Sequence, residues 1–188
     1  TALEVMRQPL EDRKISISRS KFSVEYPASF MLVAAMNPCP CGYHNDPYHE
    51  CVCSPSQVQR YLSRISGPLL DRIDIQIEIV PVPFAKLAEQ QPGEPSEVIR
   101  QRVIKAREIQ TRRFKDYAGV HCNAQMTSRM MHEFAEPDEA GFKLLKTAMT
   151  RLSLSARAYD RIIKVSRTIA DLEGAENIEA HHIAEAIT

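Results

Sequence analysis

An unbroken apolar run from Phe30 to Met36 constrains the fold more than any other segment of the chain. No polar residue interrupts it, so both faces are expected to be covered, as in an interior strand of a parallel or mixed sheet. A short buried helix is the alternative. Asn37 and Pro38 end the run at strand length, and proline disfavours the helical conformation of the residue before it. The run is therefore predicted to be a buried strand.

Asn37 directly follows this strand. In open α/β sheets, ligands bind outside the carboxyl ends of the strands. The Asn37 side chain is therefore a candidate site residue, and an asparagine that only caps a turn is the alternative.

The overall composition is that of an ordinary globular protein. The chain has 188 residues, of which 44% are hydrophobic and 26% charged, which suits one domain or two small ones. No apolar run approaches the ~18 residues of a membrane helix, and no signal peptide opens the chain, so a cytoplasmic protein without a membrane partner is expected. The net charge is zero, so nucleic-acid binding would depend on local clusters. The sequence begins with Thr1 inside a helical pattern, and we expect a fragment of a longer protein.

Residues 13–28 are predicted to form a β-hairpin. After a helix over 2–8, which Pro9 is expected to end, Ile15 and Ile17 alternate with serines, and Val24 and Tyr26 do so with Ser23 and Glu25. The basic residues at its start and tip are Arg13, Lys14, Arg19 and Lys21. Such a hairpin can follow a phosphate backbone, and a solvated edge whose charges prevent aggregation is the alternative.

Two C-x-C pairs lie in a loop over 39–53. Cys39 and Cys41 form the first pair, and Cys51 and Cys53 form the second after nine intervening residues. The loop has almost nothing that can pack a core, and a cytosolic protein rarely uses disulfides. Four thiolates around a structural Zn²⁺ would order it, with His44 or His49 as possible replacements for one cysteine. Free thiols or disulfides are the alternative. Cys122 stands alone and is predicted to be inert.

The next segments alternate between helix and strand. Ser54 is a plausible N-cap for a helix to Ile65, which Gly67 and Pro68 are expected to interrupt. Isoleucines then alternate with polar residues over 73–79, a strand pattern. Arg72 precedes it, beside Asp71 and Asp74, where a local ion pair is the simplest role.

A proline-rich linker over 81–95 separates this part from a helical one. Ser96 is expected to cap a helix that runs to about Tyr117. The predicted buried face of this helix is Ile99, Val103, Ala106 and Ile109. Its basic stripe is Arg100, Arg102, Lys105, Arg107, Arg112, Arg113 and Lys115. That stripe suits either nucleic acid, an acidic neighbour or solvent.

Further helices are predicted from Thr127, from Pro137 to about Arg151, and over 179–187. A helix over 156–172 is bounded by Ser155 and Gly174. Its predicted core stripe is Ala158, Ile162, Val165, Ile169 and Leu172. Arg157 lies in its first turn, where the helix dipole disfavours a cation, so we expect it either to contact an anion such as phosphate or to be a tolerated surface residue.

Four segments together resemble the magnesium-chelatase-like AAA+ ATPases, and within them the ComM/YifB branch. They are LEVMRQPLEDRKISISR, FMLVAAMNPCPCGY, RYLSRISGPLLDRIDI and LSLSARAYDRIIKVSRTIADLEG, which span nearly the whole chain. The resemblance implies an α/β fold: part of an AAA+ nucleotide-binding core over 1–80, then the linker, then an all-α lid over 96–188. It implies ATP and Mg²⁺ as cofactors and a hexameric ring in the full-length protein.

The resemblance also assigns roles to individual residues. It implies that Asn37 is sensor 1, which positions the attacking water, that Arg72 is the arginine finger for a neighbouring subunit, and that Arg157 is sensor 2 of the lid. It places 13–28 at a pre-sensor-1 insertion, which implies DNA contacts for Lys14, Arg19 and Lys21. Phosphoryl transfer depends on such charge stabilisation.

No G-x-x-x-x-G-K-[ST] loop occurs in this sequence, nor does an apolar run that ends in Asp-Glu. The chain is therefore predicted to be unable to hydrolyse ATP alone. The resemblance favours part of an ATP-driven DNA motor, a branch-migration helicase in recombination and natural transformation. A magnesium-chelatase motor subunit that drives metal into a porphyrin, and a non-enzymatic zinc-stabilised DNA-binding module, are the alternatives.

Overall fold

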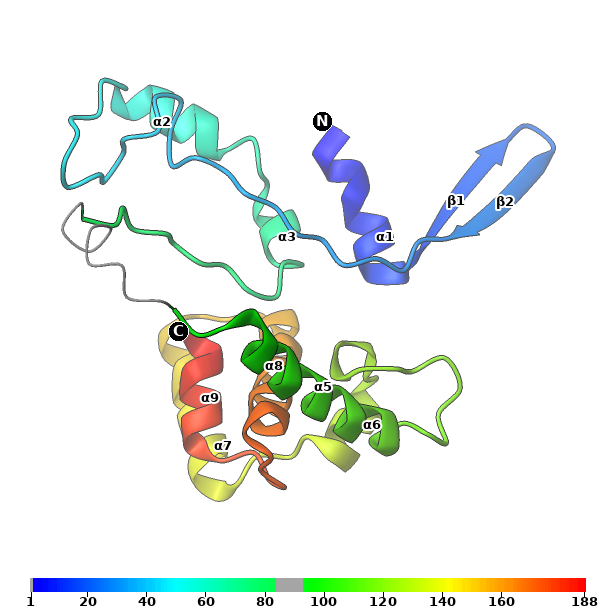
Figure 1. Ribbon diagram of the computed structural model, residues 1–188. Helices are drawn as coiled ribbons and strands as arrows, with labels where there is room; N and C mark the ends of the chain where they lie inside the picture. Colours follow the sequence, from blue (N-terminus) through cyan, green and yellow to red (C-terminus); the bar gives the residue numbers. More distant parts are fainter. Residues whose placement is uncertain (1, 84–92) are drawn as a thin grey trace. The chain divides into compact units, whose positions relative to one another are not determined.

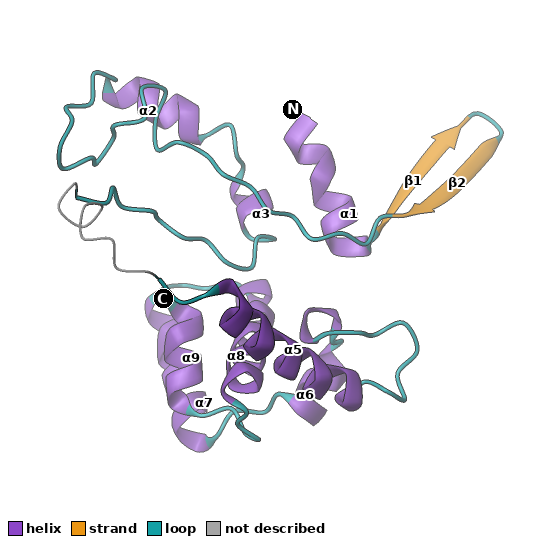
Figure 2. Cartoon of the chain, in the orientation of Figure 1, coloured by secondary structure: helices purple, strands orange, loops and turns teal. Residues whose placement is uncertain are grey.

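The computed structural model describes residues 2–83 and 93–188. The chain divides into two units, Thr1–Glu89 and Gln90–Thr188, and each is described here by itself (Figure 1). The described elements of the first unit are η1 (Ala2–Met6), α1 (Arg7–Asp12), β1 (Lys14–Arg19), β2 (Phe22–Pro27), α2 (Pro55–Leu62) and α3 (Gly67–Leu70). Long stretches between them have no regular secondary structure (Figure 2).

Pro9 lies inside the first α-helix and does not end it, contrary to the prediction. The prediction was wrong because Pro9 is the third residue of α1, where a backbone N–H has no partner within the helix in any case. The helix continues to Asp12 and ends at Arg13, whose backbone is left-handed and whose N–H donates to the Pro9 carbonyl at 3.0 Å.

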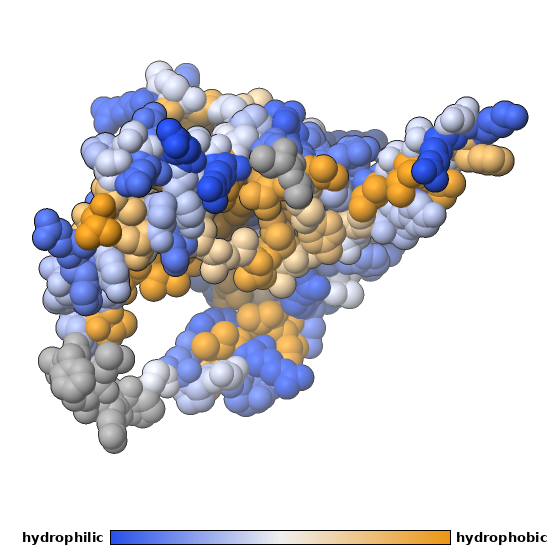
Figure 3. Space-filling model, turned by 90° about the horizontal axis from the view of Figure 1, so that it is seen from above, coloured by the Kyte–Doolittle hydropathy of each residue, from blue (hydrophilic) through white to orange (hydrophobic). Residues whose placement is uncertain are grey.

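β1 and β2 form a two-stranded antiparallel ribbon that begins directly after α1 (Figure 1). Ile15 pairs with Tyr26 and Ile17 with Val24, as the alternation predicts, and Phe22 belongs to β2 opposite Arg19. Every residue of both strands is exposed. In Figure 3 the ribbon is the arm at the right, where apolar side chains in orange lie beside polar ones in blue.

The two longest predicted strands do not form within the described residues. Residues 30–36 and 73–79 have no strand assignment, and both are largely exposed: Met31 is 85% exposed and Ile79 88%. An interior strand needs a hydrogen-bonded neighbour on each side. The structure pairs only β1 with β2 among the residues that it describes. The prediction of a buried strand at 30–36 is therefore wrong for this chain taken alone.

α2 and α3 owe their positions to serine caps. The Ser54 hydroxyl accepts from the Gln57 N–H, and the Gln57 side chain accepts from the Ser54 N–H, which makes a capping box. α2 ends at Leu62, before Gly67 and Pro68, and these two residues begin α3 behind the Ser66 cap. Proline suits the first turn of a helix, so Pro68 marks a helix start and not the predicted break.

The second unit is helical throughout its described elements. They are α5 (Ser96–Arg113), η2 (Asn123–Gln125), α6 (Ser128–Phe134), α7 (Glu139–Arg151), α8 (Ala156–Glu173) and α9 (Ala180–Ile187). α8 packs against α5, α6, α9 and η2, and α7 packs against α9. The core includes Phe114, Leu145, Ile163, Ile178 and Ile183. None of the described helices combines the length and apolar content that crossing a bilayer requires.

In α8 the capping prediction holds, whereas the predicted buried face is correct only in its first half. Ser155 caps α8 and Gly174 ends it with a φ of 76°. Of the predicted core stripe, Ala158 and Ile162 are buried, whereas Leu172 is exposed. The other buried residues of α8 include Ser166, Arg167 and Asp171. The spacing of apolar residues predicted a face that ends at Leu172, because it cannot reveal that the charged Arg167 and Asp171 are buried as an ion pair.

α5 differs from its prediction in the same way. It buries Ala106, as predicted, together with Gln110, but leaves Ile99 and Val103 exposed. It ends at Arg113, four residues before the predicted end, and the Ser96 side chain does not cap it, since the N-cap is Pro95. The Arg113 side chain is 12% exposed and pairs with the buried Asp171, so it does not belong to the basic stripe.

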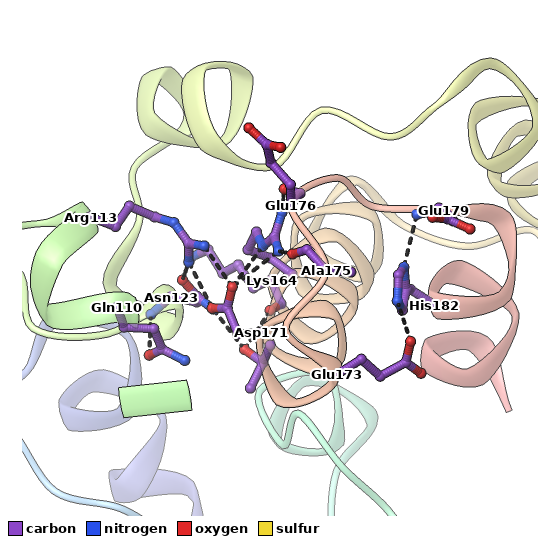
Figure 4. A network of polar contacts seen from close by, with 12 residues as sticks. Gln110, Arg113, Asn123, Lys164, Asp171, Glu173, Ala175, Glu176, Glu179 and His182 are labelled. Carbon is purple, nitrogen blue, oxygen red and sulfur yellow. Dashed lines mark hydrogen bonds and ion pairs between the residues drawn. The ribbon is translucent and has the colours of Figure 1, made fainter. Parts of the chain in front are cut away.

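Asp171 is the centre of a buried polar network (Figure 4). Arg113 donates to both of its carboxylate oxygens at 2.6 and 2.7 Å, and Arg167 donates from Nε at 3.1 Å. Asn123 donates a further hydrogen bond at 2.8 Å. The Asp171 side chain is 0% exposed, so its charge depends entirely on these partners. The network ties α5, η2 and α8 into one unit.

Replacing Asp171 by asparagine is expected to destabilise the second unit by about 3–5 kcal/mol, since it leaves two buried arginines without their counter-charge. Chemical denaturation followed by circular dichroism measures the free energy of unfolding. Asp116→Asn is the matched control, because Asp116 forms an exposed ion pair with Lys115, which contributes under about 1 kcal/mol. Equal losses of stability in the two variants would contradict the role given to the network.

Candidate functional site

The structure brings the four loop cysteines together. Their sulfur atoms all lie within 4.8 Å of one another, with 3.3 Å between Cys39 and Cys41, 3.7 Å between Cys39 and Cys51, and 3.6 Å between Cys41 and Cys51. Cys39 is fully buried. All four are free thiols, and a disulfide would need its two sulfur atoms about 2.05 Å apart. The disulfide alternative therefore does not hold in this structure.

These distances fit a tetrahedral metal centre. Thiolates about 2.3 Å from a tetrahedral Zn²⁺ lie roughly 3.8 Å from one another. The three sulfur pairs measured here fall slightly below or at that separation. Four sulfur donors are also the ligand set that Zn²⁺ takes in closed structural sites. The residues present can therefore hold one such ion, with no coordination position left for a substrate.

Backbone hydrogen bonds, burial and the nearby thiols shift the pKa values of Cys41 and Cys51 in opposite directions. Hydrogen bonding from the backbone N–H of Tyr43, aided by the neighbouring thiols, lowers the pKa of Cys41 to about 6. The backbone N–H of Cys53 lowers the pKa of Cys51, but burial and the adjacent cysteines outweigh it and raise the pKa to about 12. Several thiolates cannot share so small a volume unless a cation is among them.

The loop histidines lie outside this sulfur group. His49 stacks on Tyr43 with 4.9 Å between ring centroids, and its Nδ1 lies 3.3 Å from Asp46 Oδ1. The same carboxylate accepts from the backbone N–H groups of Tyr48 and His49, which lowers the pKa of Asp46. Neither His44 nor His49 joins the cysteines in a ligand cluster. These contacts shape the loop around the four sulfurs.

A second cluster of potential ligands joins Glu173, His181 and His182 in the second unit. Nδ1 of His182 accepts the backbone N–H of Glu179 at 2.8 Å, so the proton of a neutral ring lies on Nε2 (Figure 4). That Nε2 donates to Glu173 Oε2 at 3.0 Å, and both ring nitrogens are thereby engaged. His182 is a buried member of the α9 capping box, and with both nitrogens engaged its ring offers no lone pair to a metal ion in this arrangement.

Arg72 lies just after α3 and is held by two elements. Its Nε donates to Glu11 Oε2 at 3.0 Å, its Nη2 donates to the same oxygen, and its Nη1 donates to the Pro68 carbonyl at 2.6 Å. The Arg72 side chain is only 12% exposed. The simple expectation of a local pair with Asp71 or Asp74 is wrong: the partner is Glu11 on α1, 61 residues away along the chain.

The other residues with implied nucleotide roles lie at element ends. Asn37 is exposed at the end of the extended segment that follows the ribbon. Arg157 is exposed in the first turn of α8, directly after the Ser155 cap. Arg157 belongs to the second unit, whereas Asn37 and Arg72 belong to the first.

The three ribbon cations are not equivalent. Lys14 donates to Glu25 at 2.8 Å across the strands, and this contact raises the pKa of Lys14 and lowers that of Glu25. Arg19 and Lys21 lie at the exposed turn, beside Phe22, which is 77% exposed. The tip thus combines two cations with an aromatic ring.

Comparisons with known proteins identify the family. The model of the family described as magnesium chelatase, subunit ChlI, matches residues 1–87. The model of the C-terminal domain of the same subunit matches residues 93–188. The chain belongs to the magnesium chelatase ChlI family. The first match ends and the second begins within the proline-rich segment 81–95, so together they cover both units.

Individual relatives within the family align over nearly the whole chain. Competence protein ComM of Haemophilus influenzae is 44% identical over 186 residues, which is 98% of this chain and 35% of that protein. The protein YifB of Salmonella typhimurium is 38% identical over 187 residues, 99% of this chain and 36% of that protein. YifB of Escherichia coli matches equally. The chain therefore spans about a third of the length of these relatives.

No contact of Glu11 or Asp171 was predicted from the sequence, where both were named only within the segments that resemble the family. Both act through partners far along the chain, Arg72 and Arg113 respectively. Glu11 lies in the segment PLED, where a charge in the last turn of a helix is common, so no local pattern distinguishes it.

Proposed function

We propose that this chain is part of an AAA+ ATPase of the ComM/YifB type, in which Asn37, Arg72 and Arg157 act on ATP. The match of both units to the magnesium chelatase ChlI family carries this proposal. Asn37 positions the attacking water, Arg72 reaches the ATP of a neighbouring subunit in a hexameric ring, and Arg157 contacts the phosphates from the lid. The phosphate-binding loop and the carboxylates for Mg²⁺ are supplied by sequence outside this chain.

Local features of the structure support these assignments. Arg72 has a fixed guanidinium near the end of α3. Arg157 lies at the start of α8, where backbone N–H groups and the helix dipole favour an anion. The apolar segments 30–36 and 73–79 are exposed here, and in the proposed enzyme they are strands that complete their sheet with the rest of the protein. That sheet would bring Asn37 to a strand end, where ligands of open α/β sheets bind.

The four cysteines are proposed to hold one structural Zn²⁺ that orders residues 39–53. Cys39 lies two residues after Asn37, so the metal would fix the backbone directly beyond the proposed sensor. A closed four-sulfur site contributes folding free energy and no chemistry.

The motor is proposed to act on DNA through the β1–β2 ribbon. Its tip cations, Arg19 and Lys21, are exposed and can meet phosphates, while Lys14 is already paired with Glu25. The name of the family makes metal insertion into a porphyrin the second candidate function. ATP hydrolysis by the full-length protein, measured with and without branched DNA, separates the two: stimulation by DNA supports the motor, and indifference to DNA contradicts it.

Replacing Arg19 and Lys21 together by glutamine is expected to weaken DNA binding by the full-length protein at every sequence. Each lost phosphate contact lowers the slope of log Kd against log salt by about 1, so the slope should fall by about 2. Fluorescence anisotropy with labelled DNA over a salt series measures it. Arg60→Gln with Arg64→Gln removes the same charge from α2 and the turn that follows it, and should leave the slope unchanged. An unchanged slope in the ribbon variant would contradict the ribbon's role.

A further inference from the structure

The contact between Arg72 and Glu11 fixes a charged side chain between two separate elements. Glu11 lies on α1 and Arg72 follows α3. Two N–H groups of Arg72 meet the same oxygen, Oε2 of Glu11, and a third meets the Pro68 carbonyl. Charge-assisted hydrogen bonds of this kind are about twice as strong as neutral ones. The guanidinium therefore has one defined orientation and not the freedom of a surface arginine.

The remaining donors of Arg72 form a pair suited to an anion. A guanidinium has five N–H groups, and three are engaged here, through Nε, Nη1 and Nη2. Nη1 and Nη2 thus each keep one N–H beyond the contacts that the structure records among its described residues. Two terminal N–H groups in one plane match two oxygens of a phosphate.

We propose that Glu11 is a positioning residue: it orients the Arg72 guanidinium so that its two remaining terminal N–H groups face the phosphate of a nucleotide. The inference rests on the role proposed above for Arg72. Glu11 touches no substrate itself and acts only through Arg72. A carboxylate that fixes the arginine removes the reorientation that would otherwise accompany each turnover.

The test is a double-mutant cycle in the full-length protein, measured as kcat for ATP hydrolysis at saturating ATP. Misplacing a catalytic group by 1 Å can cost about 100-fold, so Glu11→Ala is expected to lower kcat by about 10- to 100-fold with little change in KM. Glu11→Gln keeps an acceptor oxygen and should fall between Glu11→Ala and the unmodified protein. In an Arg72→Ala background, Glu11→Ala should lower kcat no further. Asp12→Ala, which removes the next carboxylate on the same helix, is the matched control.

Each other outcome overturns the inference in a recognisable way. An equal loss of kcat with and without Arg72 would show that Glu11 supports only the fold, and thermal unfolding of each variant checks this independently. A rise in kcat on removing Glu11 would show that the carboxylate restrains Arg72. If Arg72→Ala itself leaves kcat unchanged, the proposed role of Arg72 fails first, and that failure is distinct from a failure of Glu11 alone.

Discussion

Replacing Arg72 by alanine in the full-length protein is expected to lower kcat for ATP hydrolysis by about 10³–10⁵-fold, the contribution of an arginine finger to phosphoryl transfer. The phosphoryl group gains negative charge at its oxygens in the transition state, and a guanidinium held in place stabilises it without reorganisation. Because Arg72 is proposed to act on bound ATP only in the transition state, the affinity for ATP should change little. Steady-state kinetics together with a nucleotide-binding isotherm separate these two quantities.

Arg60→Ala is the matched control for this experiment, since Arg60 is an exposed arginine on α2. It should retain kcat within a small factor. The loss in Arg72→Ala must also be distinguished from unfolding, because Arg72 is bonded to both Glu11 and Pro68. Equal circular dichroism spectra and equal zinc content in the two variants make that distinction. A kcat of Arg72→Ala close to that of Arg60→Ala would contradict the catalytic role.

Replacing Cys39 by serine is expected to abolish the metal centre. A structural Zn²⁺ in a four-ligand site provides an apparent binding free energy of about 10–16 kcal/mol, and a hydroxyl in place of the buried thiolate removes one of its four ligands. Elemental analysis of this chain should give about one zinc per chain before the change and nearly none after it. Amide hydrogen exchange over 39–53 should become fast, because this loop has almost no apolar core of its own.

Cys122→Ser makes the same chemical change outside the cluster and should leave both the zinc content and the exchange of 39–53 unaltered. Chelation of the metal from the unmodified chain should reproduce the exchange behaviour of Cys39→Ser. A metal-free chain whose 39–53 amides remain protected would refute the idea that zinc orders the loop.

Local signals in the sequence predicted the helix ends best. Ser54, Thr127 and Ser155 were each expected to begin a helix, and each accepts a hydrogen bond from a backbone N–H of the turn that follows. Capping depends on residues within three or four positions, so it is legible without knowledge of the fold. Pro9 and Pro68 were misassigned because proline both ends helices and begins them, and its position in the turn decides which.

The strands could be predicted only where their partners are adjacent. β1 and β2 lie next to each other in the chain and pair as the alternation indicates. Residues 30–36 and 73–79 have strand patterns as clear, yet they remain unpaired among the described residues. Alternation of apolar and polar residues shows that a segment can form a strand, whereas the strand forms only when a neighbouring strand is present to pair with it.

The site could be predicted in part for the same reason. The four cysteines lie within fifteen residues, and such short separations along the chain keep their sulfur atoms close in space. Glu11 and Arg72, in contrast, meet across 61 positions, and Asp171 meets Arg113 across 58. Such contacts depend on how the helices pack against one another. The pattern of apolar residues does not show which polar side chains this packing brings together.

The central claim is that Arg72 completes an ATP site on a neighbouring subunit, and mixed assemblies test it most directly. Full-length protein with Arg72→Ala is mixed with unmodified protein at a series of ratios, and ATP hydrolysis is measured after subunits have exchanged. If Arg72 acts on its neighbour, each variant subunit disables an adjacent intact site, and activity should depart from proportionality to the unmodified fraction. Activity strictly proportional to that fraction, in assemblies shown to contain both chains, would contradict the claim.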